Sequence, residues 1–323
     1  MIENVYHCSM KGMQVLITLL LLILIGGCSS GKKTDERQQA VVHERQLVLP
    51  EIPVMVRSDA ERRLYLLDHY WDSVDFTEPG IERDTLFITR SLIDYLGLSK
   101  GVDQDRRRPA ARHLIGQVER NPEALSLLMS SLSALLYDPS SARYDETLYL
   151  PFVEAAIGSD SITAAERDRL VFAREQIRKN YPGTAATDFS YKDVEGRSHH
   201  LGGLYDTVPI LIFFFRPDCG GCDVIAQQMR HSAVLGRALE ERQIRILALA
   251  TAGTVEEWEE KRSHFDPRWL QGRNVRDFEG IELYDFRAMP TFYLLSGEGI
   301  VLIKDQPFPV VEQYLSQGES DSI

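Results

Sequence analysis

The feature that most restricts how this chain can fold is an apolar run followed closely by a pair of cysteines. Residues Val208–Phe215 are apolar or aromatic, and the run is long enough for a fully buried central strand. Arg216-Pro217-Asp218 ends the run, and Cys219-Gly220-Gly221-Cys222 follows. The next segment, Asp223–Leu239, is predicted to be a helix. This order of strand, loop, cysteine pair and helix places Cys219 at a helix N-terminus.

That position gives Cys219 a specific chemistry. Unpaired backbone N–H groups and the helix dipole favour an anion at a helix N-terminus. Such settings lower the pKa of a cysteine to roughly 3.5–7.5, and the thiolate is the nucleophile. The two-residue spacer brings Cys222 close enough to form a disulfide, and its glycines leave the first sulfur open to a substrate. We therefore predict a redox-active Cys219–Cys222 disulfide that needs no other cofactor.

The surrounding segments read as alternating strands and helices. Asp188–Asp193 and His199–Leu204 flank Glu195-Gly196, which is typical of a hairpin turn. The remaining elements that we predict are a strand at Ile244–Thr251, a helix at Thr254–Ser263, strands at Phe292–Leu295 and Ile300–Ile303, and a closing helix at Pro309–Leu315.

With Met289-Pro290-Thr291 leading into the strand at Phe292, the segment 185–320 resembles the thioredoxin superfamily, especially its membrane-tethered TlpA-like branch. The resemblance implies an α/β thioredoxin-like fold, with a central mixed sheet flanked by helices, over residues 183–323. In that family a cis-proline faces the cysteine pair and prevents metal capture, and Pro290 occupies its place. The backbone before the proline pairs with an extended substrate, so Met289 and Pro290 are expected to bind substrate.

Four departures from the family pattern concern redox strength and partner choice. Phe213 stands where a buried acid is common, and Asp218 stands where tryptophan is usual. Gln227 replaces the proline that kinks the helix. Pro290 follows Cys219 by 71 positions, which is longer than in a minimal thioredoxin, and we place the extra length around Trp258–Gly280.

The N-terminus reads as an export and anchoring signal. Val15–Ile25 is an uncharged apolar run after Lys11, and it is shorter than the roughly 20 residues that span a bilayer. It ends in Leu24-Ile25-Gly26-Gly27-Cys28, which resembles a bacterial lipobox. We expect a signal peptide over 1–27, lipid on Cys28, a flexible tether over 28–50, and a place in the bacterial envelope. The alternative is a buried cysteine that closes a core helix.

Residues 51–182 are predicted to form an all-helical domain that lies before the α/β domain. The first expected helix starts near Ser58. Further helices are expected over Thr85–Leu96, Arg107–Glu119, Pro122–Leu136, Glu146–Ala156 and Thr163–Asn180. We find no catalytic constellation in it, and His69 and His113 read as isolated. The run Tyr65–Asp72 resembles the opening of a helical domain of unknown function that precedes thioredoxin modules in some envelope lipoproteins, which names no activity.

Charge and ligand spacing disfavour two other functions. The formal net charge is −12 and no basic patch stands out, so we expect no nucleic-acid partner. A zinc or copper site needs three or four ligands. The cysteine pair supplies only two ligands, and no recognised ligand spacing is found among the histidines His199, His200, His231 and His264. We therefore predict no metal.

The sequence thus favours a membrane-anchored thiol–disulfide oxidoreductase that faces the extracytoplasmic space. Cys219 would attack a substrate disulfide, and Cys222 would resolve the mixed disulfide. The TlpA-like resemblance implies a reductase that acts on protein disulfides and is re-reduced by a membrane electron donor, with the bilayer bound through lipidated Cys28. The alternative is a binding or scaffold lipoprotein whose thioredoxin-like domain is not catalytic.

Overall fold

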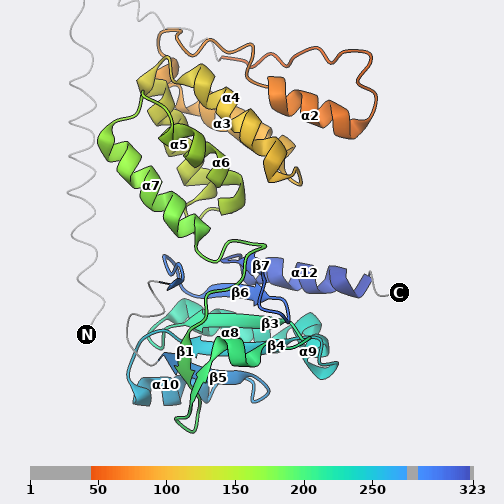
Figure 1. Ribbon diagram of the computed structural model, residues 1–323, viewed down its shortest axis with the longest axis vertical. Helices are drawn as coiled ribbons and strands as arrows, with labels where there is room; N and C mark the ends of the chain where they lie inside the picture. Colours follow the sequence, from red (N-terminus) through yellow and green to blue (C-terminus); the bar gives the residue numbers. More distant parts are fainter. Residues whose placement is uncertain (1–44, 275–282, 321–323) are drawn as a thin grey trace, which may run out of the picture. The chain divides into compact units, whose positions relative to one another are not determined.

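The computed structural model of this chain describes residues 45–274 and 283–320, as a helical region followed by a region built on a β-sheet (Figure 1). The predicted signal segment 1–27, the anchor Cys28 and residues 28–44 of the predicted tether lie outside these described residues. From Arg45 the chain contacts the helical region, because Arg45 pairs with Asp84 at 3.0 Å and Leu47 packs against the helical core. Within the described residues, no helix has the length and apolarity needed to cross a bilayer.

The helical region confirms the all-helical prediction. Ser58 with Glu61, and Thr163 with Glu166, form capping boxes, and Asn121 caps the helix that Pro122 begins. The main helices, coloured orange to green in Figure 1, are α2 (Asp59–His69), α3 (Thr85–Ser99), α4 (Gln104–Val118), α5 (Pro122–Leu136), α6 (Glu146–Ile157) and α7 (Ala164–Arg178).

One apolar core holds these helices together. Leu92 of α3, Leu128 of α5 and Val153 of α6 have no exposed surface and belong to the same cluster. Each such side chain contributes about 1.5–3 kcal/mol on burial. Trp71 and Tyr95 add an edge-to-face ring contact with centroids 5.8 Å apart.

The second region is a seven-stranded mixed sheet in the order β2-β1-β5-β4-β3-β6-β7. Strand β3 lies parallel to β4 and antiparallel to β6, as the predicted mixed sheet requires. The strands are β1 (Ser190–Lys192), β2 (Ser198–His200), β3 (Ile210–Phe215), β4 (Arg245–Ala250), β5 (Leu270–Asn274), β6 (Thr291–Leu295) and β7 (Val301–Lys304).

Strand β3 is buried on both faces, which explains its uninterrupted apolar sequence. Because successive side chains of a strand point to opposite faces, Phe213 and Phe215 belong to one core and Phe214 to the other. The core around Phe213 is shared with four helices, whose buried side chains cover that face. These helices are α8 (Gly220–His231), α9 (Ala233–Glu240), α10 (Val255–Arg262) and α12 (Phe308–Ser320).

Three predicted elements differ in the structure. The single helix expected over Asp223–Leu239 is two helices, because Ser232 has extended backbone and its hydroxyl accepts from Leu235 N–H to start α9. The strand expected over His199–Leu204 ends at His200, where a 3₁₀ turn begins.

The third difference is β5, a strand that lies within the segment treated as extra length. Its sequence, Leu270-Gln271-Gly272-Arg273-Asn274, has no apolar alternation. Its place comes from pairing on both sides, parallel to β4 and antiparallel to β1. Gly272 is required there, since a Cβ at this position would lie 2.6 Å from the ring of Tyr191. Residues 275–280 of the same segment lie outside the described residues.

Candidate active site

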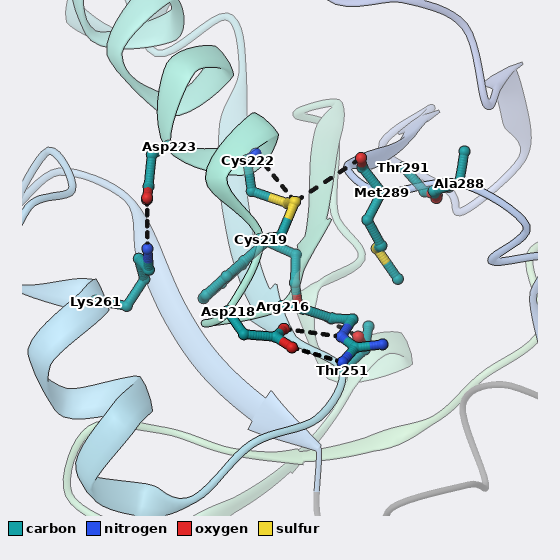
Figure 2. The surroundings of a disulfide bond; sticks show 11 residues. Arg216, Asp218, Cys219, Cys222, Asp223, Thr251, Lys261, Ala288, Met289 and Thr291 are labelled. Carbon is teal, nitrogen blue, oxygen red and sulfur yellow. Dashed lines mark hydrogen bonds and ion pairs between the residues drawn. A yellow bond between two sulfur atoms is a disulfide. The ribbon is translucent and has the colours of Figure 1, made fainter. Parts of the chain in front are cut away.

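The cysteine pair lies at the junction between β3 and α8, and the two residues form a disulfide with Cα atoms 5.3 Å apart (Figure 2). Cys219 is the N-cap residue of α8, as the sequence predicts for its place at a helix N-terminus. The backbone N–H of Cys222 points at Cys219 Sγ at 3.1 Å. An N–H group in this position stabilises a thiolate on Cys219 when the pair is reduced.

The two cysteines differ in exposure. Cys222 is 2% exposed and packs within the core beneath α8, whereas Cys219 is partly exposed at the edge of that core. A substrate that approaches from solvent therefore meets Cys219 first.

The segment before β6 faces the cysteine pair. The Met289–Pro290 peptide is cis, as expected from the resemblance. The Met289 carbonyl oxygen lies 3.8 Å from Cys219 Sγ, and Figure 2 shows it pointing toward that sulfur. The hydroxyl of Thr291 donates to the Ala288 carbonyl at 2.6 Å and so closes the turn. The structure thus brings together Cys219, Cys222, Met289 and Pro290.

Both carboxylates near the pair are balanced by cations. Arg216 donates two hydrogen bonds to Asp218, at 3.0 and 2.7 Å, which lowers the pKa of that carboxyl. Lys261 of α10 contacts both oxygens of Asp223, at 2.6 and 2.7 Å (Figure 2). The side chain of Asp218 is 66% exposed, so water screens much of its effect on Cys219.

The loop that carries the cysteines rests on the chain that follows β4. Gly253 has a φ of +99°, and a Cβ there would lie 2.9 Å from Cγ of Pro217. Thr251 is buried and donates its hydroxyl to the Phe215 carbonyl at 3.2 Å. These close contacts fix the path of the chain from β3 into Cys219.

Phe213 belongs to the same buried core as Cys222. It has no exposed surface, and its ring stacks on Phe215 and Phe292 with centroids 5.6 and 5.3 Å away. A hydrocarbon ring therefore fills the position at which a buried acid is common in the thioredoxin superfamily. Proton transfer at Cys222 cannot use a carboxyl group from this position.

The histidines of the helical region are not isolated, which corrects the prediction. His69 Nδ1 lies 2.7 Å from one oxygen of Asp72, and His113 Nε2 lies 3.1 Å from the other. Asp72, which follows α2, thus meets His113 of α4 although 41 positions separate them, and spacing along the sequence does not reveal this contact. Across residues 45–274 and 283–320, no group of three or more His, Cys, Asp or Glu side chains is placed to hold a metal ion.

Sequence reasoning missed a set of charged residues beside the Met289–Pro290 turn. Arg287 lies two residues before Met289 and pairs with Asp285 at 2.7 Å. It also forms an ion pair with Glu146, which lies 141 positions earlier in the chain. Isolated charges in helical or loop segments give no sequence signal for such pairing.

Comparisons with known proteins find matches to the helical region and to most of the chain. Residues 27–180 match the family model DUF5106, a domain of unknown function. A thioredoxin-like protein from Bacteroides caccae is 26% identical and superimposes with a TM-score of 0.78, over 84% of this chain and 98% of that protein. No curated protein matches the chain.

Two other solved structures each match less than half of this chain. The C-terminal domain of an uncharacterized protein from Bacteroides fragilis is 30% identical, covers 43% of this chain and 99% of that one, and has a TM-score of 0.41. The thioredoxin domain of a thiol-disulfide oxidoreductase from Bacteroides vulgatus is 18% identical, covers 42% of this chain and 97% of that one, and has a TM-score of 0.36.

Proposed function

We propose a thiol–disulfide exchange function, from the premise that this chain belongs to the thioredoxin-like proteins and carries a DUF5106 region before its thioredoxin-like domain. The observation that carries the proposal is the environment of Cys219. Cys219 is partly exposed at the N-terminus of α8, and its sulfur has the Cys222 N–H at 3.1 Å and the Met289 carbonyl at 3.8 Å. A nucleophile, a resolving thiol and a substrate-facing backbone are thus within one site.

The reaction moves two electrons from the reduced pair to a substrate disulfide. The Cys219 thiolate attacks one substrate sulfur, the substrate S–S bond breaks, and the departing thiolate takes up a proton. Cys222 then loses its proton and attacks Cys219 Sγ. The Cys219–Cys222 bond forms, and the second substrate thiol leaves. The N-cap position supports this order, because it stabilises the thiolate of Cys219.

The direction and location of the reaction belong to the same proposal. We propose a reductase in the bacterial envelope, held to the bilayer by lipid on Cys28, with protein disulfides as substrates. A membrane electron donor would return two electrons and two protons to the oxidised pair. The disulfide would be the redox group, without a further cofactor, and nucleic acid would not be a partner.

An alternative is a scaffold protein whose thioredoxin-like domain does not turn over. The ion pairs of Arg287 with the buried carboxylates of Glu146 and Asp285 beside the site favour a structural link between the two regions in either case. The deciding experiment is insulin reduction by the protein starting at residue 29, with a chemical thiol as reductant. A clear rate above that of the Cys219→Ser/Cys222→Ser double variant supports the enzyme. Equal rates favour the scaffold.

A further inference from the structure

A buried cluster of charged side chains joins the helical region to the segment that leads into Pro290. The Arg287 guanidinium donates to the Tyr137 carbonyl oxygen at 3.1 Å and to the Tyr144 hydroxyl at 3.2 Å. It also forms ion pairs with Glu146 and, at 2.7 Å, with Asp285. Glu146 is 5% exposed and Asp285 2% exposed, so water has little access to the carboxylate ends of these ion pairs, whereas the Arg287 side chain is 22% exposed.

The Tyr137 ring adds a further contact to the same guanidinium. The central carbon of the Arg287 guanidinium lies 3.7 Å from the centroid of this ring, which is a cation–π geometry. Burial lowers the pKa of Arg287, but the carboxylates of Asp285 and Glu146 outweigh this and raise the pKa above its usual value. Arg287 is therefore a permanently charged anchor, and most of its partners belong to the helical region.

The anchor is separated from the active site by a very short stretch of chain. Arg287 precedes Met289 by two residues, which is at most about 7 Å of extended backbone. The Ala288 carbonyl between them is already fixed by the Thr291 hydroxyl at 2.6 Å. The position of Arg287 therefore limits where the Met289 carbonyl can lie relative to Cys219 Sγ.

We propose that Arg287 is a positioning residue for disulfide exchange, through which Tyr137, Tyr144 and Glu146 of the helical region hold the Met289 backbone in place for an extended polypeptide substrate. The inference rests on the proposed function and gives the helical region a part in it. A polypeptide that pairs along Met289 depends on that backbone. A small disulfide needs only the sulfur of Cys219.

The test compares the two classes of substrate. The reduced protein is assayed with insulin and with a small aromatic disulfide, 5,5′-dithiobis(2-nitrobenzoate). In Arg287→Gln, kcat/KM for insulin should fall at least about tenfold, mainly through a higher KM, whereas the rate with the small disulfide stays within about twofold. Arg287→Lys keeps the charge and should restore part of the insulin activity. It also carries the test if Arg287→Gln does not fold.

Lys304→Gln is the matched control. Lys304 is a cation of the same cluster, 2.9 Å from Glu146 and bound to the carbonyls of Gln176 and Ile177, but it lies on β7 and not before Pro290. It should lower the melting temperature and leave the ratio of the two rates unchanged.

The outcomes separate the inference from the proposed function. Equal losses on both substrates in Arg287→Gln, no loss on either, or the same selective loss in Lys304→Gln would overturn the positioning role and leave the exchange function standing. A wild-type protein that reacts with neither substrate would overturn the exchange function, and this inference with it.

Discussion

The hydroxyl of Tyr144 donates a 3.0 Å hydrogen bond to the carboxyl of Asp305, although 161 positions separate the two residues. Burial, followed by the nearby Glu146 carboxylate, raises the pKa of Asp305 to about 7. The contact joins the helical region to the residue that follows β7. The bond therefore places a group that titrates near neutral pH where the two regions meet.

Asp305→Asn should remove a pH dependence of stability. The folded-state pKa exceeds the unfolded value of about 3.9, so the carboxyl favours folding below pH 4 and this contribution is lost as pH rises through 7. Asparagine keeps an acceptor for Tyr144 and tolerates the backbone φ of +48°. The free energy of unfolding is measured with urea at pH 4.5, 6 and 8. Relative to the wild type, the value for the variant should rise by about 2–4 kcal/mol between pH 4.5 and pH 8.

Asp138→Asn is the control for that titration. Asp138 accepts hydrogen bonds from Ser140, which lower its pKa, so it is ionised in both states throughout this pH range. The free energy of unfolding of Asp138→Asn should differ from that of the wild type by a constant amount between pH 4.5 and 8. A constant difference for Asp305→Asn as well would show that Asp305 does not titrate in the folded protein.

The two cysteines should react in a fixed order. Cys219 is partly exposed and Cys222 is 2% exposed, so limited alkylation of the reduced protein should label Cys219 first. Cys222→Ser should accumulate a mixed disulfide with a substrate, because attack occurs and resolution does not. Cys219→Ser should accumulate none, as judged by non-reducing gels and mass spectrometry. Equal labelling of both thiols would contradict the assignment of roles.

Asp218→Asn should accelerate attack by Cys219 near neutral pH. Removing the carboxylate leaves Arg216 without its partner near the pair, and both changes favour the thiolate. Because the Asp218 side chain is 66% exposed, we expect a gain of about two- to threefold, screened by salt. Asp266→Asn breaks a similar pair with Arg268, at 2.7 Å, and should leave the rate unchanged. The measurement is the pH profile of alkylation, and a slower Asp218→Asn protein would refute the argument.

Cys28→Ala should leave the protein without lipid and release it from the membrane fraction. The matched control is Cys8→Ala, since Cys8 lies inside the predicted signal segment 1–27 and should not affect anchoring. Mass spectrometry of the mature wild-type protein provides the direct measurement. An unmodified Cys28 at that point would exclude the lipid anchor.

Local sequence signals predicted much of this fold. Asn121-Pro122, the Thr163–Glu166 pair and the apolar run ending at Phe215 each act over a few residues, and their elements form where expected. The same holds for Cys219, whose place at a helix N-terminus follows from the order of strand and helix. Such signals work because capping and strand burial depend on neighbours in the chain.

The remaining features depend on partners far away in sequence. Strand β5 forms because β4 and β1 offer hydrogen bonds on both sides. Its own residues have no apolar alternation that would predict a strand. The His69–Asp72–His113 contacts and the Glu146–Arg287 pair depend on how helices and loops pack. Their residues are ordinary polar positions until the tertiary structure brings them together.

The three-residue separation of Cys219 and Cys222 has a thermodynamic consequence for repeated turnover. A crosslink that closes so short a loop removes little entropy from the unfolded chain, and it therefore adds only about 2 kcal/mol to the free energy of unfolding. The cores on both faces of β3 do not depend on it, because they are built from aromatic and aliphatic side chains of many elements. Reduced and oxidised proteins should therefore differ in melting temperature by only a few degrees. Each cycle of electron transfer would then proceed without the delay of unfolding and refolding the domain.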